Sequence, residues 1–135
     1  MLRSTVLHES FLEWLENYAP QGILITDESL IIRGWNHWLE TNARMTAAQV
    51  IGRSIFEVFP DLVERNFARF YTQVLHGESV LLSQRFHRYL LKMPAPAGID
   101  ADDMPQTARI SPLLSGDKVV GTVTMVYDVS ERVIH

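Results

Sequence analysis

Two histidine and glutamate pairs are the residues best suited to acid–base chemistry. His8 directly precedes Glu9, and His37 precedes Glu40 by three positions. An imidazole and a carboxylate within hydrogen-bonding reach of a substrate could move a proton. Nothing in the spacing brings the two pairs together, because a long stretch of chain separates them. We therefore predict no catalytic residues and no enzymatic activity for this chain.

The composition excludes several other classes of function. The chain has 135 residues and no cysteine, which excludes disulfides, thiolate metal sites and cysteine nucleophiles. We predict no metal site. The formal net charge is −4, and no run of Lys and Arg is dense enough to follow a phosphate backbone, which argues against nucleic acid as a partner. No apolar stretch approaches the roughly 20 residues of a membrane helix, so we expect no membrane contact and a cytoplasmic location.

The N-terminal residues have the pattern of an amphipathic helix. Residues 5–18 place apolar side chains on one stripe at helical spacing, and Pro20 and Gly22 end the helix. Such a stripe could cover an exposed sheet face or pack against the same helix of a second copy. The candidate residues for a dimer interface are Leu7, Phe11, Trp14, Leu15 and Tyr18.

The rest of the chain predicts strands before and after a group of helices. The predicted strands are residues 23–26, 30–33, 79–91, 106–114 and 118–129. Asn36 is expected to cap a helix, and a longer helix over 61–76 ends at Gly77. The segment 92–106 is too long for an ordinary hairpin loop, and we expect it to be mobile, either as a lid or without a role. This order predicts an α+β fold, a five-stranded antiparallel sheet with helices on one face.

Four stretches resemble successive landmarks of the PAS domain family. They are GILITDESLIIRGWN, TAAQVIGRSIFEVFP, the helix up to LHGES, and GDKVVGTVTMVYDVSER, whose Asp-Val-Ser-Glu-Arg is similar to the family's usual Asp-Ile-Thr-Glu-Arg. The resemblance implies a PAS sensory domain over residues 20–132. Residues 1–19 would then be a flanking helix, and residues 133–135 the truncated start of a C-terminal signalling helix.

The resemblance implies a sensory module of a bacterial signalling protein. The stretches SQRFHRYLLKMP and QTARISPL are most similar to the N-terminal PAS module of bacterial sensor histidine kinases. Neither a phosphoacceptor histidine region nor nucleotide-binding glycine boxes occur in these residues, so kinase activity would belong to a longer protein. The implied partners are a second copy and a downstream output domain in the same chain. The signal is expected to leave through Asp128, Glu131 and Arg132.

A ligand pocket between the helices and the sheet is also implied by the resemblance. The candidate lining residues are Trp38, Phe59, Phe67, Phe70, Phe86, Met125 and Tyr127. In the last strand, Val123, Met125 and Tyr127 are expected to face inward. The alternative interpretation is that these side chains simply fill the core, and that the domain is a ligand-free module for dimerisation or protein interaction.

The sequence excludes some cofactors but does not identify one. Photoreceptor members of the family hold flavin or a cinnamate-type chromophore through a cysteine, so covalent attachment is excluded here, and a non-covalent small molecule stays open. The sequence argues against haem, because the family's haem-ligand position falls near Arg65 or Asn66. We expect His87 to face solvent and Arg85 and Arg88 to lie on the open sheet face.

Overall fold

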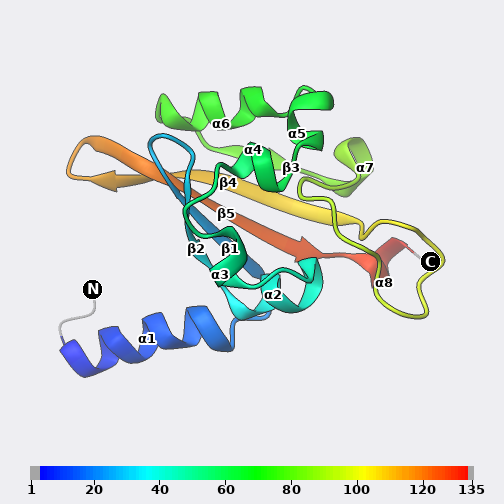
Figure 1. Ribbon diagram of the computed structural model, residues 1–135, viewed down its shortest axis with the longest axis horizontal. Coiled ribbons are helices and arrows are strands. Elements are labelled where there is room, and N and C mark those ends of the chain that lie inside the picture. Colours follow the sequence, from blue (N-terminus) through cyan, green and yellow to red (C-terminus); the bar gives the residue numbers. More distant parts are fainter. Residues whose placement is uncertain (1–3, 134–135) are drawn as a thin grey trace.

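The computed structural model describes residues 4–133 and shows an α+β fold built on one antiparallel sheet. The strands are β1 (Gly22–Asp27), β2 (Ile32–Trp35), β3 (Val80–Leu82), β4 (Gln106–Ser115) and β5 (Lys118–Asp128). Their order across the five-stranded sheet is β2-β1-β5-β4-β3, and every neighbouring pair is antiparallel. The predicted fold class is confirmed (Figure 1).

Most of the helices are short and follow the chain between β2 and β4. They are α1 (Thr5–Asn17), α2 (His37–Ala43), α3 (Ala47–Val50), α4 (Ile55–Val58), α5 (Asp61–Glu64), α6 (Ala68–Leu75), α7 (Gln84–His87) and α8 (Ser130–Val133). No helix within residues 4–133 combines the length and the apolar character needed to cross a bilayer. Figure 1 shows α1 set apart from the other helices, at the end of the molecule that holds the N-terminus.

The core lies between helices α2 to α6 and one face of the sheet. It joins fully buried strand residues such as Leu24, Ile110 and Val126 to the helix residues Leu39 and Leu62. Burial of such side chains contributes roughly 1.5–3 kcal/mol each. The sheet is therefore held against the helices mainly by the hydrophobic effect.

Hydroxyl groups also face this core from the central strands. Thr122 and Thr124 of β5 are fully buried. Thr122 Oγ1 lies 2.7 Å from Thr26 Oγ1, and Thr124 Oγ1 lies 2.8 Å from Tyr71 Oη. Burial raises the pKa of Tyr71, and the weaker opposing effect of the Thr124 hydrogen bond leaves the phenol neutral. Hydrogen-bonded hydroxyls are tolerated in a core, so Thr122 and Thr124 can share the inward face of β5 with Val126.

This arrangement corrects the predicted orientation of β5. Val123, Met125 and Tyr127 lie on the opposite face of the sheet, because side chains alternate along a strand and the threonines take the inward positions. Tyr127 is 41% exposed. Met125 and Tyr127 are therefore not lining residues of a pocket between the helices and the sheet.

Two predicted elements are broken in the structure. The helix expected over 61–76 is divided into α5 and α6, because Asn66 between them has a left-handed backbone with φ 61°. The strand expected over 79–91 is limited to the three residues of β3, after which the chain forms α7. The end of α6 is as predicted, with Gly77 at φ 98°.

The long segment before β4 packs as an extension of the core. Met93 and Met104 are each 1% exposed, and the Met104 amide donates to the Met93 carbonyl at 2.8 Å. Further along, the Ala95 amide donates to the Asp102 carbonyl at 3.1 Å. The segment therefore forms a small hairpin anchored by two buried methionines.

Candidate functional site

The predicted pocket residues are not gathered around a single pocket. Phe59 and Phe70 are buried in the core, and Trp38 and Phe67 are partly buried against it. Phe86 is 79% exposed, because it lies on α7 and not on a strand. Of the seven candidates, Phe67 and Phe86 line a cavity that lies beside the core.

This cavity, which we name the α7 cavity, has a volume of about 690 Å³. Its walls come from Arg65 and Phe67 between α5 and α6, from α7 with the turn that follows it, and from residues within 101–105. The volume lies in the range of small-molecule sites, roughly 300–1,000 Å³. Segments far apart in the sequence therefore form one concave surface.

Arg65 fixes one wall of the α7 cavity. Its guanidinium carbon lies 4.2 Å from the centre of the Phe67 ring and 4.1 Å from that of Tyr89, so the cation is held between two aromatic faces. The group pairs with Asp61 at 3.0 Å and donates to the carbonyl oxygens of His87 and Tyr89. Its charge is compensated within the protein, and its donors hold the chain that follows α7.

Arg88 lies in a strained turn within the same wall. Its backbone has φ 67° and ψ −61°, and the Tyr89 amide donates to the His87 carbonyl at 2.8 Å, which defines a γ-turn that is rare for residues other than glycine. The Gln106 amide donates to the Arg88 carbonyl at 2.8 Å and helps to hold the turn. Such strain is concentrated at ligand sites and switch regions. The exposed Arg88 side chain belongs to this turn, which corrects its expected place on the sheet face.

Gln106 connects this wall to the C-terminal strand. Its side chain is buried, and its Oε1 accepts from the amides of Leu90 and Leu91, both at 3.1 Å. Its Nε2 donates to the Leu91 carbonyl at 2.7 Å. Gln106 also pairs across the sheet with Asp128, the last residue of β5. One buried side chain thus fixes the position of the cavity wall relative to the end of the sheet.

The predicted exit segment begins at Asp128, the last residue of β5. Its Oδ1 accepts from the Ser130 amide at 2.8 Å and from the Ser130 hydroxyl, so this carboxylate caps the start of α8. The amide of Val129 donates at 3.0 Å to the carbonyl of Pro105, a residue that lines the α7 cavity. The exit and the cavity are therefore in direct contact through the backbone.

The other predicted exit residues follow in α8. Glu131 is exposed in the first turn of this helix, and Arg132 also lies within it. Of the segment predicted to begin a signalling helix, residues 134–135 lie outside the described residues.

Asn36 joins the N-terminal helix to the domain. It is 4% exposed, and its Oδ1 accepts from the amides of Ile23 at 3.1 Å and Leu39 at 3.3 Å. Its Nδ2 donates to the carbonyls of Leu15 at 3.2 Å and Gln21 at 2.9 Å. The predicted cap of α2 is therefore also the anchor for the end of α1 and the start of β1.

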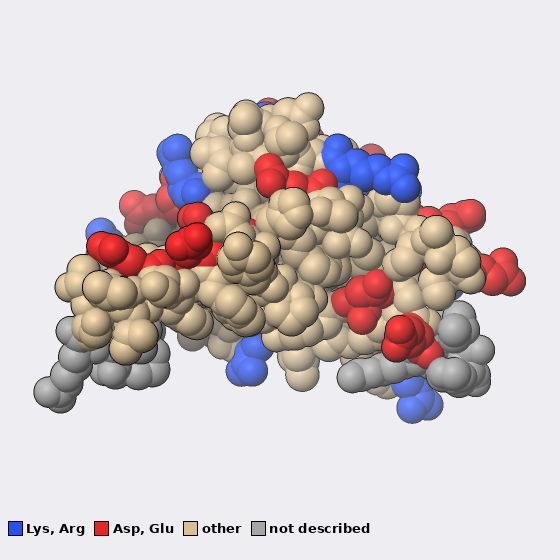
Figure 2. All heavy atoms as spheres, turned by 90° about the horizontal axis from the view of Figure 1, so that it is seen from below, with Lys and Arg blue, Asp and Glu red and all other residues tan. Residues whose placement is uncertain are grey.

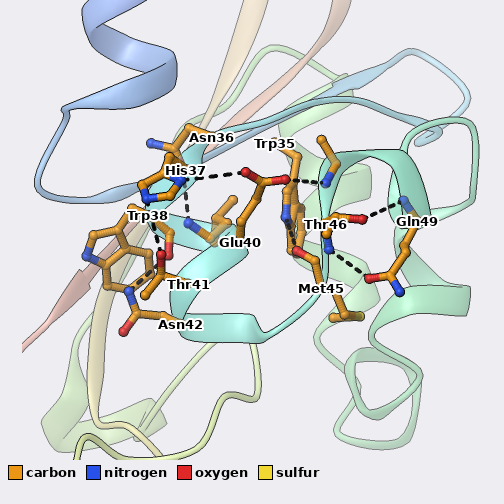
Figure 3. Close-up of polar contacts among 12 residues, drawn as sticks. Trp35, Asn36, His37, Trp38, Glu40, Thr41, Asn42, Met45, Thr46 and Gln49 are labelled. Atoms are coloured by element: carbon orange, nitrogen blue, oxygen red, sulfur yellow. Dashed lines mark hydrogen bonds and ion pairs between the residues drawn. The ribbon is translucent and has the colours of Figure 1, made fainter.

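Figure 3 shows one of the two candidate acid–base pairs, His37 and Glu40. Glu40 points toward His37, with Oε1 at 3.6 Å from Nδ1, and its Oε2 accepts from the Ala47 amide at 2.8 Å. Glu40 thus holds α2 against α3, while His8 and Glu9 are exposed on α1. Within the described residues, no group of three or more His, Cys, Asp and Glu could hold a metal ion.

The comparisons with known proteins agree with this fold. The family described as the PAS fold matches residues 17–134, and the chain belongs to this family. No curated protein matches the chain.

Solved structures of low sequence identity share the architecture. The PAS domain of a protein from Colwellia psychrerythraea has 16% identity and a TM-score of 0.67, with 93% of this chain and 99% of that chain covered. The sensory box sensor histidine kinase from Vibrio cholerae has 20% identity and a TM-score of 0.59, with 95% and 98% covered. VqmA bound to DPO has 20% identity and a TM-score of 0.65, with 93% of this chain and 58% of that chain covered.

Proposed function

We propose that this PAS domain is the input module of a bacterial signal-transduction protein, and that it senses a small ligand in the α7 cavity. One observation carries the proposal: the cavity wall is hydrogen-bonded to the exit. Pro105 accepts from Val129, and Arg88 accepts from Gln106, the cross-strand partner of Asp128. A ligand that repositions this wall would act directly on the first residues of α8.

The similar structures support the class of protein and the presence of a ligand. One is a sensory box sensor histidine kinase, and another is VqmA bound to DPO. By this analogy, the present chain would pass its signal to an output domain, with a histidine kinase as the first candidate. The ligand site proposed here is the cavity beside the core that Phe67 and Phe86 line, and not the predicted pocket between the helices and the sheet.

The mechanism needs two arrangements of the exit with different affinities for the ligand. A ligand shifts a conformational equilibrium only by its difference in affinity for the two states. The γ-turn at Arg88 supplies a segment whose strain can differ between them. A change in this turn or in the position of the Pro105 carbonyl would alter the end of β5 and the start of α8. This junction between β5 and α8 would be the two-state element that coupling requires.

Replacing Asp128 with alanine tests the exit. The variant should lose only about 1 kcal/mol of capping energy and remain folded, because only the start of α8 depends on this carboxylate. In the full-length protein, however, output activity should no longer depend on the stimulus. Asp117→Ala, in the turn between β4 and β5, is the matched control and should retain stimulus dependence. A folded Asp128→Ala protein that still responds would contradict this route.

Dimerisation is the second candidate function, and the exposure of α1 favours it. No residue of α1 is buried, and Phe11 and Trp14 are each 43% exposed, with their rings stacked at 6.3 Å. Leu7 and Tyr18 are 60% and 70% exposed, and Leu15 is half-buried. Figure 2 shows a largely uncharged surface, with acidic groups beside it, at the end of the molecule where α1 lies. Association with a second copy would remove this apolar area from water.

The double variant Phe11→Ser with Trp14→Ser tests this interface. The protein should sediment as a dimer, and the double variant as a monomer, because these two rings are the largest apolar groups of the α1 surface. Leu114→Ser changes another exposed apolar residue, at the end of β4, and should leave the dimer intact. A double variant that remains dimeric would place the contact elsewhere, most directly on the open face of the sheet.

A further inference from the structure

The α7 cavity has charges of both signs in its lining. Arg65 and Arg88 lie in the wall formed by the segments around α7, and Asp102 and Asp103 lie in the 101–105 segment. Arg65 is paired with Asp61, whereas Arg88 forms no ion pair with any residue of the described range 4–133. Arg88 is therefore the cation of this wall whose charge is available to a ligand.

The segment that contains Asp102 and Asp103 is held in place by backbone contacts. The Asp102 carbonyl accepts from the Ala95 amide at 3.1 Å, and Asp103 forms an antiparallel bridge with Pro94. Neither carboxylate forms an ion pair with a residue that the structure describes. Both aspartates therefore line the cavity, and their carboxylates are not used in ion pairs within the described residues.

Aromatic surface completes the cavity. Phe67 is partly buried, and Phe86 is 79% exposed although it lines a concave site. Both rings can contact the apolar part of a ligand, and each ring face also attracts a cation. The exposed area of Phe86 is one that a bound molecule would remove from water.

We propose that the α7 cavity binds a small zwitterion, namely a free amino acid or a close analogue. Its carboxylate would pair with Arg88, its ammonium group with Asp102 and Asp103, and its side chain would contact Phe67 and Phe86. A ligand with only a negative charge would meet the two carboxylates, and one with only a positive charge would meet Arg88. A neutral ligand would displace water from unpaired charges without replacing their interactions. This inference rests on the proposed function, because it names the ligand class of the same cavity.

Titration of the isotope-labelled protein with each standard L-amino acid tests the ligand class. At least one amino acid should shift the amide resonances of residues 86–89 and 101–103, which line the cavity. For the amino acid that binds best, calorimetry should show about tenfold weaker binding after N-acetylation and after amidation, because each removes one charge.

Variants of the charged cavity residues then test which residue binds each charged group of the ligand. Arg88→Gln should remove the preference for the amino acid over its amide, and Asp102→Asn with Asp103→Asn should remove the preference over its N-acetyl form. Arg85→Gln is the matched control, because Arg85 lies on α7 without lining the cavity. Its affinities should equal those of the unmodified protein.

The outcomes separate this inference from the proposed function. Equal binding of the amino acid and its singly charged derivatives in the cavity would overturn the zwitterion proposal and leave a ligand-sensing cavity. The absence of any binding amino acid would also overturn it. The response of the full-length protein in the Asp128→Ala experiment decides the proposed function independently of either result.

Discussion

Replacing Asn36 with leucine is expected to lower the free energy of unfolding by about 3 kcal/mol or more. Leucine has a similar size but cannot bond the amides of Ile23 and Leu39 or the carbonyls of Leu15 and Gln21. These groups meet at a buried position, and a buried polar group without a partner costs about 1–3 kcal/mol. The effect should be large because one side chain serves the ends of three elements.

Denaturant unfolding of Asn36→Leu and of a matched control measures this effect. Asn42→Leu is the control, because within residues 4–133 the Asn42 side chain makes one hydrogen bond, to the Trp38 carbonyl at 2.9 Å. It should lose no more than about 1 kcal/mol. Hydrogen exchange should also become faster in the last turn of α1 in the Asn36 variant. Equal stability of the two variants would show that α1 is anchored by other contacts.

Replacing Gln106 with leucine should destabilise the protein by a similar amount, about 3 kcal/mol. The change leaves the Leu90 and Leu91 amides and the Leu91 carbonyl without their partner in a fully buried region. Gln73→Leu, on the exposed side of α6, is the control and should change stability by less than about 0.5 kcal/mol.

The Gln106 variant should also weaken the coupling between the cavity and the exit. At a temperature where it remains folded, a ligand should still shift the amides of α7 but should shift those of Val129 and Ser130 less than in the unmodified protein. Unchanged shifts at both sites would show that Pro105 alone carries the coupling.

The sequence predicted those parts of the fold that depend on local patterns. The presence of β1 and β2, the Asn36 cap and the end of α6 follow from β-rich runs, a capping residue and the glycine at position 77. The orientation of β5 could not be predicted in this way. Thr122 and Thr124 are polar residues, and they can be buried because their hydroxyl groups bond to residues far away in the sequence. The partners become known only once the strands are paired.

The candidate site was only partly predictable for the same reason. Asp128 belongs to the exit motif on which the resemblance rests, and its bond to the Ser130 amide is local in the sequence. The α7 cavity, in contrast, joins residues near 65, 88 and 103, and Arg65 acts there through carbonyl groups that carry no sequence signal. The γ-turn at Arg88 could not be predicted from the sequence either, because the residue at this position is not a glycine. The three hydrogen bonds that Asn36 makes beyond its helix cap, to Leu15, Gln21 and Ile23, could not be predicted from the sequence for the same reason.

The most direct test of the account is to fill the α7 cavity and observe the exit. The chain has no cysteine, so Phe86→Cys creates a single thiol at the cavity, and a maleimide attached to it would occupy the space. Hydrogen exchange of the Val129 and Ser130 amides is then compared before and after labelling. Leu114→Cys, labelled in the same way at the end of β4, is the control.

Labelling at position 86 is expected to change exchange at Val129 and Ser130 by about fivefold or more, equivalent to about 1 kcal/mol in the opening free energy. Labelling at position 114 should leave both amides unchanged. Exchange that changes in α7 and its turn but not at Val129 or Ser130 would contradict the claim that occupancy of the α7 cavity is transmitted to the exit.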